Sequence, residues 1–363
     1  MTVLEVVFFA SLVLLAWTHL GYPLVAWSVG RLRPRRIDGD DITPSVAVIV
    51  AAHNEEPVIG RRIENLLALD YPADKLEIVV TSDASTDGTE EVAAGMGARV
   101  IRNPRGGKVA AQDRAVRETE SELVAFSDAN ATWAPDALRK LVRSFADPEV
   151  AYVCGQLRLE AADGSNKEGL YWRYEMGVRA AESRLGSVTG GNGSIYALRR
   201  SDYVEVDPRF GHDLSLPYLM VQRGRRAVYE PQALAFEKPT PSNETEYRRK
   251  VRMFEHCWLI VLRGKMLRGL GAVYLLEILS HRHLRYASGV LHLLLLATSA
   301  ALATHGWFYA VVLGAQLFVL LAAASGVGIA RYYTLVTWAT VRALWNYARR
   351  GVPATWQAAE GTR

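Results

Sequence analysis

Apolar residues are arranged along the chain in two different ways. Near both ends they form long runs, at Val3 to Val29, Tyr286 to Thr304 and Trp307 to Ala330. Each run is about as long as the 20 or so residues of helix that cross a bilayer core. Between them, roughly from Thr43 to Thr240, apolar segments are short and alternate with polar ones. This pattern predicts a water-soluble domain flanked by membrane helices.

Basic residues beside these runs predict the orientation in the membrane. Four arginines follow the first run: Arg31, Arg33, Arg35 and Arg36. A secretory signal would instead have its basic residues before the apolar core. Arg282, Arg285 and Arg331 lie on the outer flanks of the other two runs, which are joined by a tight turn. Because positive residues stay on the cytoplasmic side, we expect an uncleaved anchor, a hairpin and a cytoplasmic domain in a multi-pass protein of the inner cell membrane.

The runs and the soluble stretch together suggest how the chain is divided. We expect these parts: a transmembrane anchor (1–30), a basic cytoplasmic linker (31–43), the soluble domain (44–240), interfacial helices (241–285), a transmembrane hairpin (286–330) and a basic amphipathic C-terminal segment (331–363). Residues 331–350 mix aromatic residues with arginines, which favours a helix lying on the membrane, with a short span as the alternative. The alternative for the hairpin is a pair of very apolar soluble helices.

The soluble stretch alternates strand-like and helix-like segments. Residues 45–52 are continuously apolar, as a buried parallel strand requires. Strands are predicted at residues 45–52, 77–82, 100–102 and 123–127, and helices at 57–69, 89–96, 108–119 and 135–145. Strands alternating with helices of this length predict an α/β fold, with an open and mostly parallel sheet covered by helices on both faces.

Polar clusters follow three of these strands at their carboxyl ends. His53-Asn54-Glu55 follows the first strand, Asp83 to Gly88 the second, and Asp128-Ala-Asn130 the fourth. Ligands of open α/β sheets bind at that edge, so we expect the three clusters to converge on a ligand. The alternative is that each is a local turn, and that Asp87 and Glu90 form a helix capping box.

The spacing of Asp128 and Asn130 has a chemical use. Residues i and i+2 of an extended segment point to the same side of the chain. Their oxygen atoms suit Mg²⁺ or Mn²⁺, which prefer oxygen ligands and share them with phosphate groups. A cation in this position would stabilise a leaving diphosphate. We therefore predict a divalent-metal site at Asp128 and Asn130, weaker than a site with two acids because the amide carries no charge.

Seven segments in order resemble the family 2 glycosyltransferases, and among them the membrane-embedded, synthase-like members. They are VAVIVAAHNEE, TSDASTDGT, GGKVAAQDRAV, FSDANATWAPDAL, GGNGSIYALRR, HDLSLPYLMVQRGRRAVYEP and RRKVRMF. The resemblance covers most of the chain, and seven ordered matches are far more specific than any one of them. It implies a GT-A type nucleotide-sugar-binding domain.

The resemblance also implies which residues bind the donor. It assigns nucleotide-sugar binding to His53, Glu55, Asp83, Lys108, Asp128 and Arg252. His53 stands where the family stacks an aromatic ring on the base, and Asp83 matches the acid that recognises uracil, so a UDP-sugar is the expected donor. Asp128 and Asn130 match the metal-binding DxD-type motif, with Asn130 in place of the usual second acid.

On the acceptor side, the resemblance implies a glycine-rich segment and a catalytic base. It assigns the acceptor to Gly191, Asn192, Gly193 and His212, and the base to Asp213. His212 replaces the acid that usually precedes the base. An inverting transfer needs a group that takes the proton of the acceptor hydroxyl, and a lone carboxylate suits this role. The alternatives are an ordinary glycine turn and a helix cap at Asp213.

Arg252 holds the arginine position of the family motif Gln-x-x-Arg-Trp, but this chain lacks the Gln and the Trp. Arg252 either contacts the diphosphate or lies at the membrane surface. Since the Trp usually supports the acceptor sugar of polymer-forming members, its absence argues against processive synthesis. The small number of membrane runs argues the same way.

Composition excludes some other classes. Half of the residues are hydrophobic (50%), 22% are charged, and the formal net charge is +4. Many basic residues stand beside the apolar runs, so we expect a bilayer and no nucleic acid as partner. Cys154 and Cys257 lie in apolar contexts without metal-ligand spacing, which predicts buried free thiols.

The expected activity is inverting, metal-dependent transfer of a sugar from a UDP-sugar to a membrane-held acceptor, lipid-linked or glycan. We expect a role in exopolysaccharide or cell-envelope glycan synthesis, together with export or assembly partners. Two alternatives stay open from the sequence: a processive polysaccharide synthase, and an inactive scaffold of an export complex that only binds nucleotide sugar.

Overall fold

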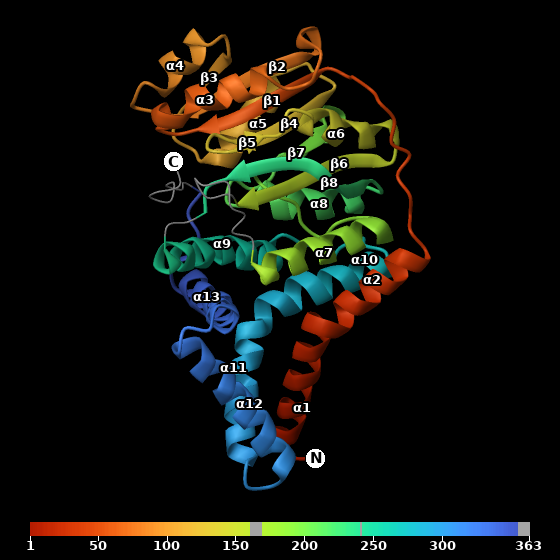
Figure 1. Ribbon diagram of the computed structural model, residues 1–363, viewed down its shortest axis with the longest axis vertical. Coiled ribbons are helices and arrows are strands. Elements are labelled where there is room, and N and C mark those ends of the chain that lie inside the picture. Colours follow the sequence, from red (N-terminus) through yellow and green to blue (C-terminus); the bar gives the residue numbers. More distant parts are fainter. Residues whose placement is uncertain (160–168, 240–241, 355–363) are drawn as a thin grey trace.

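The computed structural model describes residues 1–159, 169–239 and 242–354. Figure 1 shows an α/β domain at one end of the molecule and long helices that converge near the N-terminus at the other. Helices α7 (Leu170–Leu185), α9 (Asn243–Arg263) and α13 (Gly328–Arg350) lie between these two parts.

One eight-stranded sheet forms the α/β domain, in the order β3-β2-β1-β4-β7-β6-β8-β5. The strands are β1 (Val46–Ala52), β2 (Leu76–Asp83), β3 (Arg99–Asn103), β4 (Leu123–Asp128), β5 (Thr132–Trp133), β6 (Val150–Leu159), β7 (Tyr196–Arg199) and β8 (Arg226–Glu237). The β3-β2-β1-β4 half is parallel throughout. Strand β7 is antiparallel to both of its neighbours, while β6 and β8 run parallel.

Helices cover both faces of the sheet, as the sequence predicted. They are α3 (Glu56–Leu67), α4 (Thr89–Gly95), α5 (Lys108–Glu118), α6 (Ala137–Arg143) and α8 (His212–Gln222). Every residue of β1 is buried, and its side chains alternate between two cores. Val46, Val48 and Val50 join the core under α3 and α6, whereas Ala47 and Ile49 join the one under α5 and α8. This alternation is the period of an extended strand.

The sequence predicted the parallel half of the sheet within one or two residues at most strand and helix ends, but it gave no strand for β5, β6, β7 or β8.

The capping box considered for Asp87 and Glu90 was also wrong. Gly88 is the N-cap residue of α4. Asp87 accepts a hydrogen bond from the Thr89 backbone N–H at 3.1 Å, and Glu90 pairs with Arg102 instead of reaching back.

Among the described residues, three helices are long and apolar enough to cross a membrane. The first, Val3–Leu32, joins α1 (Val3–Ala16), a π-helical turn and α2 (Tyr22–Leu32). The second, Ala272–Leu302, joins α10 (Ala272–Glu277), another π-helical turn and α11 (Leu284–Leu302). The third is α12 (Trp307–Ala324), in which no residue is buried.

The second and third apolar helices begin or end at other residues than the apolar runs of the sequence predicted. The second begins at Ala272, inside the stretch expected to hold interfacial helices. The run predicted over residues 307–330 is divided, because α12 ends at Ala324 and α13 begins at Gly328. Gly326 lies between them with a φ of 89°, a conformation that glycine adopts without strain.

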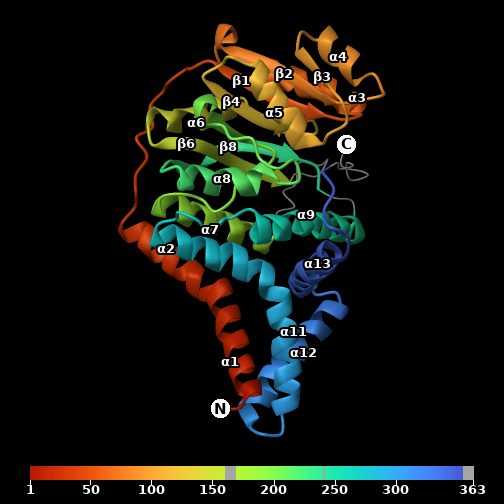
Figure 2. The same cartoon turned by 180° about the vertical axis from the view of Figure 1, so that it is seen from behind.

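Polar contacts join the helices that lie between the sheet and the apolar helices to their neighbours. The Trp258 indole N–H on α9 donates to the backbone oxygen of Thr340 on α13 at 3.0 Å. The Tyr22 hydroxyl on α2 donates to Glu182 on α7 at 2.7 Å. Figure 2 shows α7 and α9 crossing beneath the sheet, between it and the long helices.

Candidate active site

Strand β4 ends at Asp128, beside the start of α5. Lys108 is the first residue of α5, and Gly107 before it has a φ of 93°, which lets the chain turn sharply into the helix. The Lys108 ammonium forms an ion pair with Oδ1 of Asp128. Burial opposes the charge on Lys108, but the carboxylates of Asp128, Asp213 and Glu237 outweigh it and raise the pKa of Lys108. Lys108 is thus the cation at the centre of the site.

Asp83 holds the loop that leads to Lys108. It ends β2, is 3% exposed, and accepts hydrogen bonds from the backbone N–H groups of Gly106 at 2.7 Å and Gly107 at 3.1 Å. Arg105 forms an ion pair with the same carboxylate, at 2.5 Å. Two backbone donors and a guanidinium on one carboxylate fix the loop firmly. Its contact with a uracil base stays a prediction.

The cluster after β1 is bound to the cluster after β2. A ring nitrogen of His53 lies 2.8 Å from the backbone oxygen of Asp83. Asn54 accepts a hydrogen bond from Thr86 N–H at 2.8 Å and has a φ of 55°. Glu55 is buried, and its backbone N–H donates to the Thr89 hydroxyl at 2.8 Å. His53 and Asp83 therefore adjoin each other at one edge of the sheet.

The glycine segment is confined by its neighbours. A Cβ on Gly191 would lie 1.8 Å from the Tyr152 hydroxyl, and one on Gly190 would lie 2.5 Å from a guanidinium nitrogen of Arg282. Arg282 belongs to the second apolar helix and donates to the backbone oxygen of Thr189 at 3.2 Å. Arg179 on α7 donates to the backbone oxygen of Gly191 at 2.8 Å. Glycine is therefore required at 190 and 191 by lack of space.

Glu237 was missed from the sequence, and Ser194 was predicted only as part of the glycine-rich segment. The Ser194 hydroxyl lies within hydrogen-bonding distance of both Asp128, at 3.3 Å, and Glu237. Glu237 is the last residue of β8, and burial together with the nearby Asp128 raises its pKa to about 7. The sequence held one signal for it, an acid at the carboxyl end of a strand, as at Asp83 and Asp128. That signal was lost because β8 itself was not predicted.

These oxygen atoms fit a divalent cation. Asp128 and Glu237 approach the same hydroxyl from different strands, and their mutual repulsion contributes to the raised pKa of Glu237. A cation between them would relieve that repulsion. The described residues contain no cluster of three or more His, Cys, Asp and Glu side chains arranged for a metal. A cation here would therefore draw further ligands from Asn130, from water or from the donor phosphates.

Helix α8 places Asp213 at the site and His212 beneath it. His212 is 4% exposed, with its two ring nitrogens 3.0 Å from the Tyr196 hydroxyl and 3.3 Å from the Tyr203 hydroxyl. Burial, and after it the charge of Lys108, lowers the pKa of His212 to about 3, so the ring is neutral. His212 thus lies in the core below the position expected for an acceptor contact. Asp213 is partly exposed, and its charge reaches Lys108.

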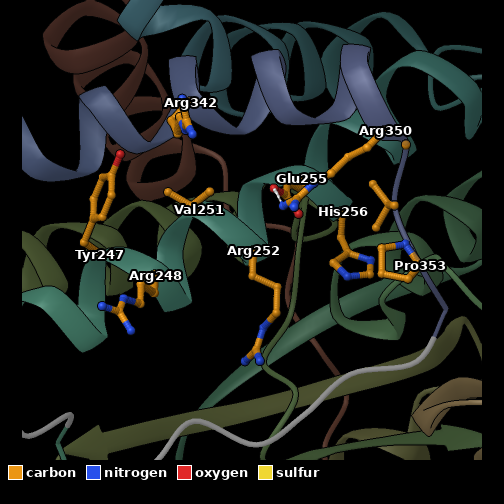
Figure 3. Close-up of a pocket in the computed structure, with 11 residues that line it drawn as sticks. Tyr247, Arg248, Val251, Arg252, Glu255, His256, Arg342, Arg350 and Pro353 are labelled. Atoms are coloured by element: carbon orange, nitrogen blue, oxygen red, sulfur yellow. Dashed lines mark hydrogen bonds and ion pairs between the residues drawn. The ribbon is translucent and has the colours of Figure 1, made fainter.

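Helix α9 presents two arginines to different surroundings. Arg249 pairs with Glu246 at 2.8 Å, and its charge lowers the pKa of Glu237, so Arg249 lies on the side of the carboxylates. Arg252 lines a pocket between α9 and α13, which is drawn in Figure 3. The contact of Arg252 with the diphosphate stays a prediction, and Arg249 was missed from the sequence.

Asp128 at the end of β4, Lys108 at the start of α5 and the partly exposed Asp213 on α8 thus lie in the part of an open α/β fold that binds ligands. Residues 47–206 match the family model described as Glycosyl transferase family 2. This part of the chain is therefore similar to the family 2 glycosyltransferases.

Relatives of known name support this class. The chain is 30% identical over 222 residues to an N-acetylglucosaminyltransferase of Rhizobium sp., covering 54% of this chain and 49% of that protein. It is 32% identical over 176 residues to the beta-monoglucosyldiacylglycerol synthase of Synechocystis sp., covering 45% of this chain and 36% of that protein. The chain thus spans about half the length, or less, of these curated relatives.

One solved structure resembles nearly the whole chain. It is the mannosyltransferase PcManGT from Pyrobaculum calidifontis in complex with GDP-Man and Mn²⁺, with a TM-score of 0.75 and 25% sequence identity. The likeness covers 96% of this chain and 99% of that chain. It therefore includes the helices below the sheet as well as the GT-A domain.

Proposed function

We propose that this protein transfers a sugar, with inversion and with the help of a divalent metal, from a UDP-sugar to a membrane-held acceptor at the cytoplasmic face of the inner membrane. The observation that carries the proposal is the ion pair of Lys108 with Asp128, whose other carboxylate oxygen lies 3.3 Å from the Ser194 hydroxyl that also binds Glu237. This cluster lies where an open α/β sheet binds its ligand, and the charge of Asp213 also acts on Lys108.

On the donor side, Asp128, Glu237 and Asn130 would hold Mg²⁺ or Mn²⁺. Such an ion neutralises the charge of a departing nucleoside diphosphate. Lys108, which is paired with Asp128, is positioned to bind a phosphate oxygen as well. Asp83 keeps the Lys108 loop in place, and its position next to His53 supports a role for both at the base.

On the acceptor side, Asp213 acts as the general base. Its carboxylate takes the proton of the acceptor hydroxyl while the hydroxyl oxygen attacks the anomeric carbon and the bond to the diphosphate breaks. One displacement of this kind inverts the anomeric centre. The lack of a side chain at Gly193, where a Cβ would meet only the Lys108 ammonium at 3.9 Å, leaves the backbone open to a sugar ring. The partial exposure of Asp213 supports this role.

The acceptor is proposed to be a lipid or a lipid-linked glycan of the cell envelope. Three helices that could cross a membrane, one of them without a buried residue, support a membrane-held substrate. The name of the Synechocystis relative describes a glycolipid product. Export or assembly partners would be needed only if the product leaves the cytoplasmic face.

The test is nucleoside diphosphate release by the detergent-purified full chain. Wild type, Asp213→Asn and the surface control Asp207→Asn would be given UDP-sugars and GDP-sugars with Mg²⁺ or Mn²⁺, with and without a membrane lipid extract. We expect release from one UDP-sugar, and we expect the lipid extract to raise its rate. Asp213→Asn should lower that rate by roughly two to four orders of magnitude, and the control should retain it.

The other outcomes each exclude part of the proposal. Release from a GDP-sugar alone would show that the donor is not a UDP-sugar. GDP-sugars are included because PcManGT was solved in complex with GDP-Man. Insoluble product made without lipid would indicate a processive synthase. Nucleotide-sugar binding without release under any condition would indicate a scaffold.

A further inference from the structure

A pocket of about 700 Å³ lies outside the carboxylate cluster, between α9, α13 and residues 351–353. Figure 3 shows arginine side chains reaching it from both helices, with Arg248 and Arg252 on α9 and Arg342 and Arg350 on α13. His256 also lines it. The pocket is thus bordered by cationic groups from two elements that are far apart in the sequence.

One acid in the pocket does not balance these cations. Glu255 is 4% exposed and accepts hydrogen bonds from Arg350 at 2.9 Å and from Asn346 at 2.6 Å. Its negative charge is therefore neutralised by Arg350. In the part of the chain that the structure describes, Arg342 makes no hydrogen bond or ion pair. Beside the pocket, Glu244 also pairs with Arg248 at 2.9 Å. Four arginines against these two acids still leave the pocket with a net positive charge, which suits an anion, and guanidinium groups suit phosphate in particular.

The walls of the pocket are apolar as well as cationic. Val251, Val352 and Pro353 line it together with the ring of Tyr247. Inorganic phosphate would gain nothing from such walls, whereas a ligand with hydrocarbon beside its phosphate would bury apolar surface there. The lining therefore fits an amphiphilic phosphate better than a free ion.

The pocket also lies at the level where a membrane surface is expected. Helix α13 approaches α11 so closely that a Cβ on Gly289 would lie 2.5 Å from the backbone oxygen of Thr337. On α13, Trp338 is 51% exposed and Trp345 is 53% exposed. Exposed tryptophans beside apolar helices are typical of the boundary between lipid and water. One wall of the pocket thus belongs to a helix at that boundary.

We propose that this pocket binds the phosphate-bearing headgroup of a membrane lipid. The inference rests on the proposed function and specifies its acceptor as a lipid phosphate or diphosphate. His256 connects the pocket to the catalytic side, because its ring lies 2.7 Å from the backbone oxygen of Arg209, in the loop that leads to Asp213. The pocket therefore adjoins, through His256, the loop that precedes the proposed base.

The test measures binding by titration calorimetry with the detergent-purified full chain. Dihexanoyl phosphatidic acid is the probe, and inorganic phosphate and dihexanoyl phosphatidylcholine are the comparators. The pocket variant is Arg248→Gln with Arg342→Gln. The control is Arg349→Gln, whose side chain stacks over the Trp345 ring at 4.7 Å outside the pocket. Arg342→Gln alone, at an exposed position, serves if the double variant does not fold.

Wild type should bind phosphatidic acid more tightly than either comparator, and the pocket variant should bind it roughly tenfold more weakly or worse. The control should match wild type. Equal affinity for inorganic phosphate would overturn the lipid assignment, and unchanged binding by the pocket variant would overturn the site. Nucleoside diphosphate release is measured on the same samples, since its absence in wild type removes the transferase proposal without affecting the lipid-binding result.

Discussion

The backbone N–H of Gly191 donates a hydrogen bond to the backbone oxygen of Asp213 at 2.5 Å. The glycine segment and the start of α8 are therefore one unit, although 21 residues separate the two positions in the sequence. Any shift of the glycine segment moves the proposed base with it. Tyr152 determines how much room that segment has, because its hydroxyl lies directly against Gly191.

Gly191→Ala should therefore lower kcat at least tenfold and destabilise the protein by about 1–3 kcal/mol, as overpacking does. Adding Tyr152→Phe removes the nearest clashing atom and should restore part of both losses. Gly193→Ala is the matched control, since its Cβ would lie 3.9 Å from the Lys108 ammonium, at ordinary contact distance. Equal losses at 191 and 193 would contradict the steric explanation. Initial rates and thermal melting measure both effects.

Lys108→Met should weaken nucleotide-sugar binding and lower kcat/KM by roughly ten- to a hundredfold, because a charged hydrogen bond to the diphosphate is lost. The same change leaves Asp128 without its counter-ion. Lys140→Met is the control, since that lysine pairs with Asp136 on α6, at 2.6 Å. Calorimetric titration with the nucleoside diphosphate gives the affinity, and unaltered binding would separate Lys108 from the phosphates.

Glu237→Gln should weaken Mn²⁺ binding at least tenfold. The substitution keeps the shape and the contact with Ser194 but removes one of the two carboxylates beside that hydroxyl. Free Mn²⁺ measured by electron paramagnetic resonance gives the dissociation constant independently of turnover. Glu205→Gln, which loses only a surface ion pair with Arg117, should behave as wild type. Equal Mn²⁺ affinity in all three proteins would leave Asp128 and Asn130 as the whole metal site.

Asp113→Asn should stabilise the protein at neutral pH. Burial raises the pKa of Asp113 to about 6, although the Tyr203 hydroxyl donates to it. Below about pH 3 the carboxyl is mostly protonated in both the folded and the unfolded chain. As the pH rises toward 6 the unfolded chain ionises first, so the wild type loses up to about 3 kcal/mol of stability. The two melting temperatures should therefore agree near pH 3 and diverge by pH 7, and a constant difference would contradict this.

The parallel half of the sheet was predictable because its strands are buried on both faces. All of β1 and most of β2 and β4 are buried, so they form continuous apolar runs in the sequence. Strand β8 gave no such run, because its buried first residues are followed by exposed ones at Pro231 and Gln232. Its place in the sheet depends on pairing with β6, whose residues lie far away in the chain. Such register is a tertiary property that local periodicity does not contain.

The residues of the candidate site likewise divide into those that the sequence could predict and those that depend on tertiary pairing. Asp128 and Lys108 belong to the predicted half, and their ion pair could be anticipated from the strand order. Glu237 reaches Asp128 only through the pairing of β8, and Arg249 reaches Glu237 only through the packing of α9. His212 was assigned to the acceptor side by the resemblance to the family, and its burial could not be foreseen from the sequence. Its ring is instead enclosed by Phe126, Tyr196 and Tyr203.

The hydrogen bond from Arg282 to the backbone of Thr189 has a consequence for the enzyme in its native surroundings. Arg282 belongs to a helix that, in the proposed placement, enters the bilayer, while Thr189 directly precedes the glycine segment. A helix whose apolar length does not match the hydrocarbon thickness responds by tilting. Such a tilt would move Arg282 and, through its hydrogen bond to Thr189, the backbone of the glycine segment that is bonded to the proposed base. The turnover rate would then depend on the acyl-chain length of the surrounding lipids, because that length would alter the geometry of the glycine segment.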